Sequence, residues 1–278
     1  MKIAVTGANG FIGRYVLAEL LKHEIEIIAI TRSSNRPAWL NKSIHNVGVD
    51  ISRFSQDCYE QIGCPEILIH LAWEGLPNYK SSYHLETEFP KQLNFLKAVI
   101  ESGLPSLFVT GTCFEYGIQS GSLSEEMQVK PNNPYGYAKN ELREQLEALK
   151  SDNFFSLTWA RLFYMYGQGQ ASTSLYTKLK EAVMRGDKVF NMSGGEQLRD
   201  YMPVKEVARQ IVKLAMIKRD LGIVNICSGK PISVRKLVEQ WLSENSWDIE
   251  LNFGHYPYPD YEPMEFWGDS SRIDSISS

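Results

Sequence analysis

The first residues of the chain pass from a strand pattern through three spaced glycines into a helical pattern. Lys2–Thr6 is rich in β-branched residues, glycines follow at positions 7, 10 and 13, and apolar residues recur at helical spacing over residues 11–23. Glycine permits a tight turn and a close approach of backbone to phosphate, and a helix N-terminus offers unpaired N–H groups. This order predicts a dinucleotide site, and a bare structural turn is the alternative. The residues expected to contact the cofactor here are Gly7, Asn9, Gly10, Phe11, Ile12 and Gly13.

The same alternation continues through the N-terminal half. Strands are expected at residues 25–30, 47–50, 66–71, 106–110 and 155–161, and residues 135–149 are rich in strong helix formers. Strands that alternate with helices predict a parallel sheet covered by helices on both faces. The expected fold class is α/β, with a doubly wound parallel sheet of the Rossmann type and a smaller C-terminal substrate lobe.

A change of pattern after Gly167 sets the expected domain boundary. Residues 168–174 are polar and loop-like, whereas residues 204–218 are again an amphipathic helix and residues 222–227 again a strand pattern. The prediction is a dinucleotide-binding Rossmann domain over residues 1–166 and a mainly substrate-binding lobe over residues 167–278. Within this lobe, residues from about 200 to 228 are expected to return to the first sheet.

Charge and composition exclude several classes of function. The formal charge is −4, from 29 basic and 33 acidic residues without long runs of one sign, which gives no support for binding nucleic acid or an anionic membrane. No apolar run approaches the roughly 18 to 20 residues that cross a bilayer. Met1 leads directly into a strand pattern without a signal-peptide pattern, so we expect a cytoplasmic protein. The four cysteines include no CxxC pair, which predicts reduced thiols and no metal site.

The end of the second expected strand bears on the form of the cofactor. NAD sites usually carry an acid there for the ribose hydroxyls, but this chain reads Thr31-Arg32-Ser33-Ser34. Arg32 is suited to pair with a 2′-phosphate, with Ser33 or Ser34 adding hydrogen bonds. The cofactor predicted from Thr31, Arg32 and Ser33 is NADPH rather than NADH, and a solvated loop arginine is the alternative.

Several motifs in order carry a resemblance to a known family. They are TGANGFIG at residues 6–13, Asp50-Ile51, His70-Leu71-Ala72, Gly111-Thr112, Tyr135 with Lys139, RLFYMYG at residues 161–167, and Arg199-Asp200-Tyr201. Over nearly its full length the chain resembles the extended short-chain dehydrogenases/reductases, in the branch of nucleotide-sugar epimerases, dehydratases and reductases. The resemblance implies that Asp50 and Ile51 approach the adenine and that Leu71 and Ala72 line the cofactor channel.

Tyr135 and Lys139 are the candidate acid-base pair. Their four-residue spacing places them on one face of a helix, whereas Tyr137 should point elsewhere and serve packing. A free phenol has a pKa of about 10, so it needs a nearby cation to exchange protons at neutral pH. In the family the tyrosine exchanges the proton at the reacting oxygen, the lysine also binds the nicotinamide ribose, and a Ser or Thr orients the substrate. Thr112 occupies that last position. The alternative is that Tyr135 only packs and Lys139 is solvated.

Departures from the family pattern reduce the number of reactions that the chain is expected to catalyse. Dehydratases of this branch carry an Asp-Glu pair after the Ser or Thr, where this chain has Cys113 and Phe114, and Glu115 is expected to be structural. Residues 70–79 are similar to those of the dTDP-4-dehydro-6-deoxyhexose reductases. The prediction is NADPH-dependent reduction of the C4 ketone of a nucleotide-linked, dTDP-type 4-dehydro-6-deoxy sugar. The alternatives are a nucleotide-sugar 4-epimerase that retains NAD and a non-catalytic NADP(H) sensor.

The remaining expectations concern substrate and assembly. The expected substrate contacts are Trp73, Thr112, Cys113, Tyr164 and Arg199. Trp73 would form a wall beside the sugar, with a buried core tryptophan as the alternative. The fork of Arg199 suits the diphosphate in the second lobe, and the alternative is a salt bridge with Asp200. Many relatives have asparagine where Tyr164 stands, so contacts transferred to it are open. The family resemblance also implies a homodimer built partly from the Tyr135 helix.

Overall fold

The computed structural model describes residues 1–258 and 262–277. The chain forms two compact units. The first unit contains residues 1–117, 128–162 and 208–224, and the second contains residues 118–127, 163–207 and 225–278. Residues 118–127 lie inside the range that the sequence assigned to the Rossmann domain, and they join the second unit because residues 121–123 pair with residues 266–268.

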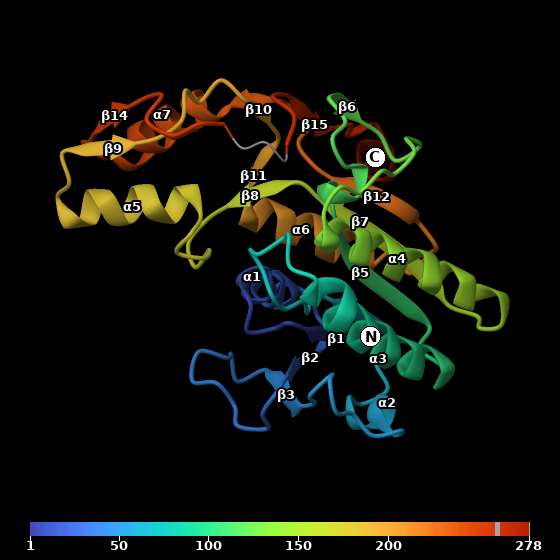
Figure 1. Cartoon of the computed structure of the whole chain (residues 1–278). Helices are drawn as coiled ribbons and strands as arrows, with labels where there is room; N and C mark the ends of the chain where they lie inside the picture. Colours follow the sequence, from blue (N-terminus) through green and yellow to red (C-terminus); the bar gives the residue numbers. More distant parts are fainter. Residues whose placement is uncertain (259–261, 278) are drawn as a thin grey trace. The chain divides into compact units, whose positions relative to one another are not determined.

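A seven-stranded sheet organises the first unit (Figure 1). In spatial order its strands are β3 (Ile44–Gly48), β2 (Glu26–Thr31), β1 (Lys2–Thr6), β4 (Ile67–His70), β5 (Ser106–Thr112), β7 (Ser156–Leu162) and β12 (Gly222–Ile226). From β3 to β7 each neighbouring pair is parallel. The chain winds in one direction from β1 to β3 and in the other from β4 onward, so the switch point lies between β1 and β4. Ligands of such sheets bind at the carboxyl ends of the strands beside this point. The predicted α/β Rossmann class is confirmed.

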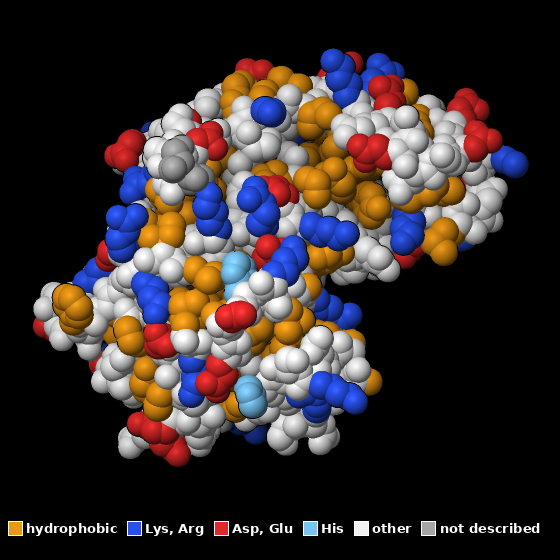
Figure 2. All heavy atoms as spheres, turned by 180° about the vertical axis from the view of Figure 1, so that it is seen from behind, with side chains coloured by type: hydrophobic (Ala, Val, Ile, Leu, Met, Phe, Trp, Pro, Cys, Tyr) orange, Lys and Arg blue, Asp and Glu red, His pale blue; other side chains and the backbone are white. Residues whose placement is uncertain are grey.

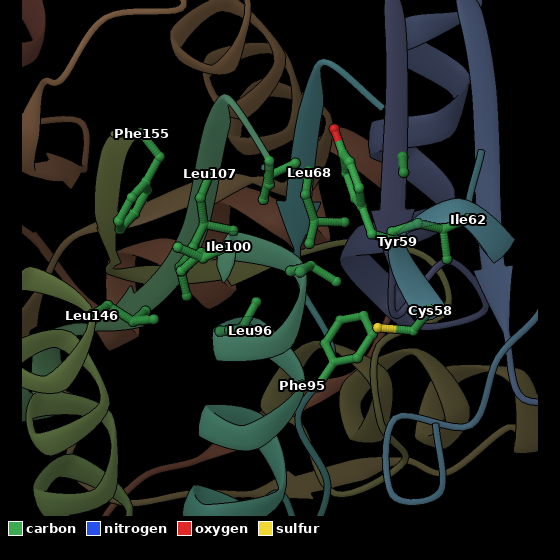
Figure 3. Close-up of a cluster of buried hydrophobic side chains, with 14 of the residues drawn as sticks. Cys58, Tyr59, Ile62, Leu68, Phe95, Leu96, Ile100, Leu107, Leu146 and Phe155 are labelled. Atoms are coloured by element: carbon green, nitrogen blue, oxygen red, sulfur yellow. The ribbon is translucent and has the colours of Figure 1, made fainter. Parts of the chain in front are cut away.

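The helices of the first unit cover this sheet. They are α1 (Phe11–Leu20), α2 (Cys58–Gln61), α3 (Phe89–Glu101), α4 (Pro134–Ala148) and the greater part of α6 (Val204–Ala215), with short helical turns η1 (His84–Glu88), η2 (Cys113–Tyr116) and η3 (Leu149–Ser151). Figure 3 shows Phe95, Leu96 and Ile100 of α3 beside Leu68 of β4 and Leu107 of β5. These side chains are at most 3% exposed. Since complete burial of one such side chain contributes about 1.5–3 kcal/mol, this layer fixes α3 on the sheet.

The third strand differs from its predicted range. Residues 47–50 were the expected strand, but β3 is Ile44–Gly48 and pairs with β2 from Ile27 to Thr31. Asp50 ends the extended segment, because its carboxylate accepts hydrogen bonds from the N–H and hydroxyl of Ser52 at 2.9 and 2.7 Å. The residues Ile44, His45 and Asn46 lack the β-branched run by which a strand is found from sequence.

Short strands pair within the second unit. The pairs are β6 (Gly121–Leu123) with β15 (Phe266–Gly268), β8 (Tyr164–Tyr166) with β11 (Tyr201–Pro203), β9 (Val189–Asn191) with β14 (Glu250–Asn252), and β10 (Leu198–Arg199) with β13 (Ile232–Ser233). The helices are α5 (Leu175–Arg185), α7 (Val234–Asn245) and α8 (Ser271–Ser277). Trp241 of α7 is 1% exposed and packs against Tyr166 and Tyr176, so aromatic side chains supply much of this smaller core.

The surface is mixed in charge. Figure 2 shows Lys and Arg side chains intermingled with Asp and Glu on the visible face, in keeping with the net charge of −4. Among the residues that the structure describes, no helix has both the length and the apolar character required to cross a membrane.

Candidate active site

The glycine turn lies at the switch point of the sheet. Gly7 follows β1 with φ of +66°, a backbone conformation that disfavours any side chain, and its carbonyl accepts the N–H of Gly10 at 2.8 Å. A Cβ on Gly13 would lie 2.2 Å from the same carbonyl oxygen, so Gly13 lets α1 start against the turn. Gly10 is the N-cap of α1 and supplies no side-chain hydrogen bond. The first N–H groups of α1 therefore suit an anion, and this cradle fits a pyrophosphate.

Residues after β4 form the wall beside this turn. Thr6 accepts hydrogen bonds from the N–H groups of Leu71 and Ala72 at 3.1 and 3.3 Å, and its hydroxyl also bonds Nδ1 of His70 at 2.9 Å. Burial of the His70 ring lowers its pKa to about 3, so the imidazole is neutral at physiological pH. Leu71 and Ala72 thus lie against the glycine turn, as the family resemblance implies for a cofactor channel.

The loop after β2 carries the residues expected to distinguish the two cofactors. Thr31 donates to the carbonyl of Ser33 at 2.7 Å, and Ser33 in turn accepts the N–H of Asn35 at 3.1 Å. Arg32 is 77% exposed and forms an ion pair with Glu74, a residue that was not a sequence candidate. The Asp50 carboxylate, which follows β3, has a lowered pKa, mainly because of its bonds to Ser52 and partly because of Arg32. Ile51 packs against the core on the α3 face.

Thr112, Tyr135 and Lys139 come together in the first unit. Tyr135 is 7% exposed and Lys139 is 2% exposed, so both lie on the buried face of α4, whereas Tyr137 is 52% exposed. Lys139 donates from Nζ to the carbonyl of Thr110 at 2.9 Å, and the side chains of Thr112 and Tyr135 are hydrogen bonded. The four-residue spacing therefore separates the two tyrosines as predicted, and β5 brings Thr110 and Thr112 to the α4 pair.

Burial dominates the electrostatics of this trio. It lowers the pKa of Lys139 to about 7, against the raising influence of Glu115 and Glu88. Burial also raises the pKa of Tyr135, and the hydrogen bond from Thr112 opposes this only in part. Tyr135 is consequently a neutral phenol at neutral pH, and Lys139 changes its charge near that pH.

Aromatic side chains surround Tyr135: the substrate candidate Trp73, and Tyr79 and His84, which were not sequence candidates. The rings of Tyr79 and His84 lie 5.6 and 5.2 Å from it, centroid to centroid, and Trp73 lies 5.9 Å away. The Trp73 ring also covers Nζ of Lys139, with the nitrogen 4.0 Å from the ring centroid. The indole N–H donates to Nδ1 of His84 at 3.1 Å, so His84 Nε2 carries the proton that reaches the Asn78 carbonyl at 2.9 Å. No spacing signal singles out Tyr79 or His84, since both lie on irregular or π-helical backbone.

Glu115 and its neighbours brace the trio. The Glu115 carboxylate is fully buried and accepts the Thr112 N–H at 2.8 Å, the Trp159 indole N–H and the Arg161 guanidinium at 2.7 Å. These contacts agree with the structural role predicted for it. Cys113 is a buried thiol at the start of η2.

The other two substrate candidates, Tyr164 and Arg199, line a cavity of about 770 Å³ within the second unit. The Tyr164 hydroxyl donates to Glu262 at 2.5 Å. Arg199 is 3% exposed and donates to Glu262 at 3.0 Å and to the carbonyls of Leu198, Pro263 and Met264 at 2.8 to 3.1 Å. Its guanidinium pairs with Glu262 rather than with Asp200, whose carboxylate accepts from Ser228 and Gly229. A diphosphate contact by Arg199 would require an exchange of these bonds.

The sheet, its glycine turn and the buried Tyr-x-x-x-Lys pair define the class of short-chain dehydrogenases/reductases. Within that class, the chain belongs to the NAD dependent epimerase/dehydratase family, whose model matches residues 3–227. The predicted family, its nucleotide-sugar branch and the assignment as an oxidoreductase are confirmed.

Two curated relatives match almost the whole chain. A dTDP-6-deoxy-L-talose 4-dehydrogenase (NAD(+)) from Aggregatibacter actinomycetemcomitans is 34% identical over 270 residues, which cover 96% of this chain and 99% of the relative. A GDP-6-deoxy-D-talose 4-dehydrogenase from the same organism is 27% identical over 285 residues, which cover 98% and 90%. Among solved structures, a UDP-N-acetylglucosamine 4-epimerase from Methanobrevibacter ruminantium M1 is similar with a TM-score of 0.85 and 21% identity, over 100% of this chain and 92% of that one. This last likeness concerns the fold.

Proposed function

We propose that this chain reduces the C4 ketone of a dTDP-linked 4-dehydro-6-deoxy sugar to a hydroxyl, giving a deoxyhexose for surface polysaccharide or glycoside synthesis. The observation that carries the proposal is the buried Thr112, Tyr135 and Lys139 set in the same unit as the glycine turn. The 34% identical relative is named for a 4-dehydrogenase of a dTDP-6-deoxy sugar, which is the same chemical step in the opposite direction. Cytoplasmic location and a homodimer stay predictions.

The cofactor in this proposal is a nicotinamide dinucleotide. The glycine turn and the start of α1 would hold its pyrophosphate, Leu71 and Ala72 would flank it, and Asp50 with Ile51 would lie toward the adenine. When bound, the reduced nicotinamide supplies the hydride that C4 of the sugar receives. Arg32 considered alone predicts NADPH as the cofactor, whereas the name of the 34% identical relative specifies NAD(+).

The residues of the trio have distinct roles. As C4 gains the hydride, its carbonyl oxygen becomes an alkoxide, and the Tyr135 hydroxyl donates the proton that turns it into a hydroxyl. Burial, which raises the pKa of Tyr135, keeps this proton in place at neutral pH. Thr112 orients the sugar oxygen by a hydrogen bond. The charged form of Lys139 stabilises the phenolate left on Tyr135 until solvent returns a proton.

The neighbours of Thr112 support reduction over dehydration. Loss of water requires an acid and a base beside the sugar, but Cys113 is a buried thiol and Phe114 has no proton to exchange. The Glu115 carboxylate already accepts hydrogen bonds from Thr112, Trp159 and Arg161. A 4,6-dehydratase is therefore not proposed.

A second candidate is a 4-epimerase that retains NAD. Relatives named as 4-epimerases match the chain, among them a UDP-arabinose 4-epimerase from Arabidopsis thaliana that is 22% identical over 98% of this chain. Such an enzyme uses the same tyrosine and lysine but returns the hydride to the sugar.

One experiment separates these candidates from a non-catalytic sensor. Purified protein is mixed with dTDP-4-keto-6-deoxyglucose and either NADH or NADPH, and the nicotinamide absorbance is followed while the sugar is identified by mass spectrometry and NMR. Oxidation of one nicotinamide for each sugar reduced supports the proposal. Isomerised sugar without net oxidation supports the epimerase, and cofactor binding without any change in the sugars of this class supports the sensor.

A further inference from the structure

Arg32 and Glu74 face each other across the carboxyl end of β1. Arg32 follows β2 and Glu74 follows β4, and β1 lies between these two strands in the sheet. Gly7, where the glycine turn begins, follows β1 at the same edge. The ion pair between Arg32 and Glu74 therefore forms at the edge of the sheet where the fold places a dinucleotide.

Glu74 is held in place by contacts that do not involve Arg32. Its backbone N–H donates to the buried Glu88 carboxylate at 2.8 Å, and its own carboxylate accepts from Lys91 at 3.1 Å and from the Tyr83 hydroxyl at 3.2 Å. Arg32 is 77% exposed, whereas Glu74 is 38% exposed. The acid is thus the more firmly held member of the pair, and the arginine is the more exposed side chain that reaches it.

The carboxylates around Arg32 are charged at neutral pH. Burial raises the pKa of Glu74, but the hydrogen bond and the charge of Lys91, with the charge of Arg32, lower it overall. Asp50, which also feels the charge of Arg32, has a lowered pKa as well, chiefly through its bonds to Ser52. Arg53 lies near Asp50, and Lys91, the Glu88 carboxylate and the Tyr83 hydroxyl lie around Glu74.

We propose that Glu74 makes this chain select NAD(H) over NADP(H) in two ways. Its carboxylate occupies Arg32, and its negative charge adds to that of Asp50 where a 2′-phosphate would approach Arg32. A 2′-phosphate carries a charge of about −2 at pH 7, so it would have to displace Glu74 from Arg32 and remain beside it. A ribose with a free 2′-hydroxyl has no such conflict, and the Glu74 carboxylate supplies, from the segment after β4, the acceptor that is missing at the end of β2. The inference rests on the proposed use of a nicotinamide cofactor.

The test measures cofactor binding without any sugar. Isothermal titration calorimetry gives the dissociation constants of NADH and NADPH for the wild type, for Glu74→Gln, and for Glu60→Gln, a matched loss of one exposed acid on α2. Glu74→Gln keeps the size of the side chain and the backbone bond to Glu88, and Lys91 keeps its ion pair with Glu88. Circular dichroism and thermal unfolding confirm that each variant is folded.

Wild-type protein should bind NADH at least as tightly as NADPH. Glu74→Gln should shift the ratio of the two dissociation constants toward NADPH by on the order of tenfold, because the like charge is removed and Arg32 is released. Glu60→Gln should leave the ratio unchanged. A wild type that prefers NADPH by tenfold or more would overturn the inference, and so would an unchanged ratio in folded Glu74→Gln. Because no turnover is measured, failure here is separate from failure of the proposed reduction.

Discussion

At the scale of single residues, Tyr135 and Tyr137 provide a matched pair of variants. Tyr135→Phe removes the hydroxyl that is hydrogen bonded to Thr112, and loss of a positioned acid typically costs about 10²- to 10⁴-fold in turnover. Tyr137→Phe alters an exposed ring two residues away and should leave kcat within about twofold. Steady-state kinetics with the keto sugar measures both, and cofactor titration should give equal affinity for the two variants. Full activity of Tyr135→Phe would contradict the role of Tyr135 as the proton donor.

Lys139 should make stability depend on pH. Its pKa is about 7 in the folded protein, whereas an unfolded lysine titrates near 10.4. Between these values the unfolded chain binds more protons, so the free energy of unfolding should rise as the pH increases from about 7 to about 9. Lys139→Met should lack this rise. Urea unfolding of both proteins at several pH values measures the difference, and parallel curves would show that Lys139 is not buried as a titrating group.

His84 is expected to act through Trp73. His84→Leu leaves the Trp73 indole N–H without its acceptor and the Asn78 carbonyl without its donor, which should cost about 1–3 kcal/mol of stability. In a Trp73→Phe background one of these two groups is already absent, so the same change should cost less. A double-mutant cycle by urea unfolding gives the coupling free energy. A coupling of zero would mean that the bond between the two rings contributes nothing.

At the scale of elements, the start of α4 sets the position of Tyr135. Asn133 is the N-cap, and its side chain accepts the N–H of Gly136 at 2.9 Å, while Pro134 begins the helix. Asn133→Ala should lower the free energy of unfolding by about 1 kcal/mol and should also reduce kcat, since Tyr135 lies two residues into the helix. Asn133→Asp keeps an acceptor and should restore both properties. Equal losses in the two variants would contradict a capping role.

The sequence predicts the elements that follow local rules. Helix α4 was expected at residues 135–149 and is Pro134–Ala148, and β1 coincides with its expected range, because periodicity and β-branched runs are properties of neighbouring residues. By contrast, β3 was displaced, since its position depends on pairing with β2. The same limit applies to the site. The four-residue spacing between Tyr135 and Lys139 distinguishes Tyr135 from Tyr137, but no local pattern marks His84, Tyr79 and Glu74, which lie on irregular or π-helical backbone.

At the scale of the whole molecule, distant segments determine the two units. Strand β12 adds to the sheet beside β7, although about 60 residues separate them in the chain, and this return was expected from a local strand pattern. The pairing of β6 with β15 joins residues that lie about 145 positions apart. Neither strand has a sequence pattern that identifies the other as its partner. The placement of residues 118–127 in the second unit could therefore not be predicted.

The homodimer predicted from the family resemblance would be built partly from α4. Helix α4 contacts η1 in the first unit. Tyr137 of α4 is 52% exposed and Leu85 of η1 is 40% exposed, so these neighbouring elements present apolar side chains to solvent. In a two-fold symmetric dimer a substituted residue enters the interface twice. Tyr137→Glu should therefore bring two acids into it and shift the protein to monomer in size-exclusion chromatography with light scattering. Met184→Glu, on an exposed residue of α5, should leave the dimer intact, and a monomeric wild type would contradict the prediction.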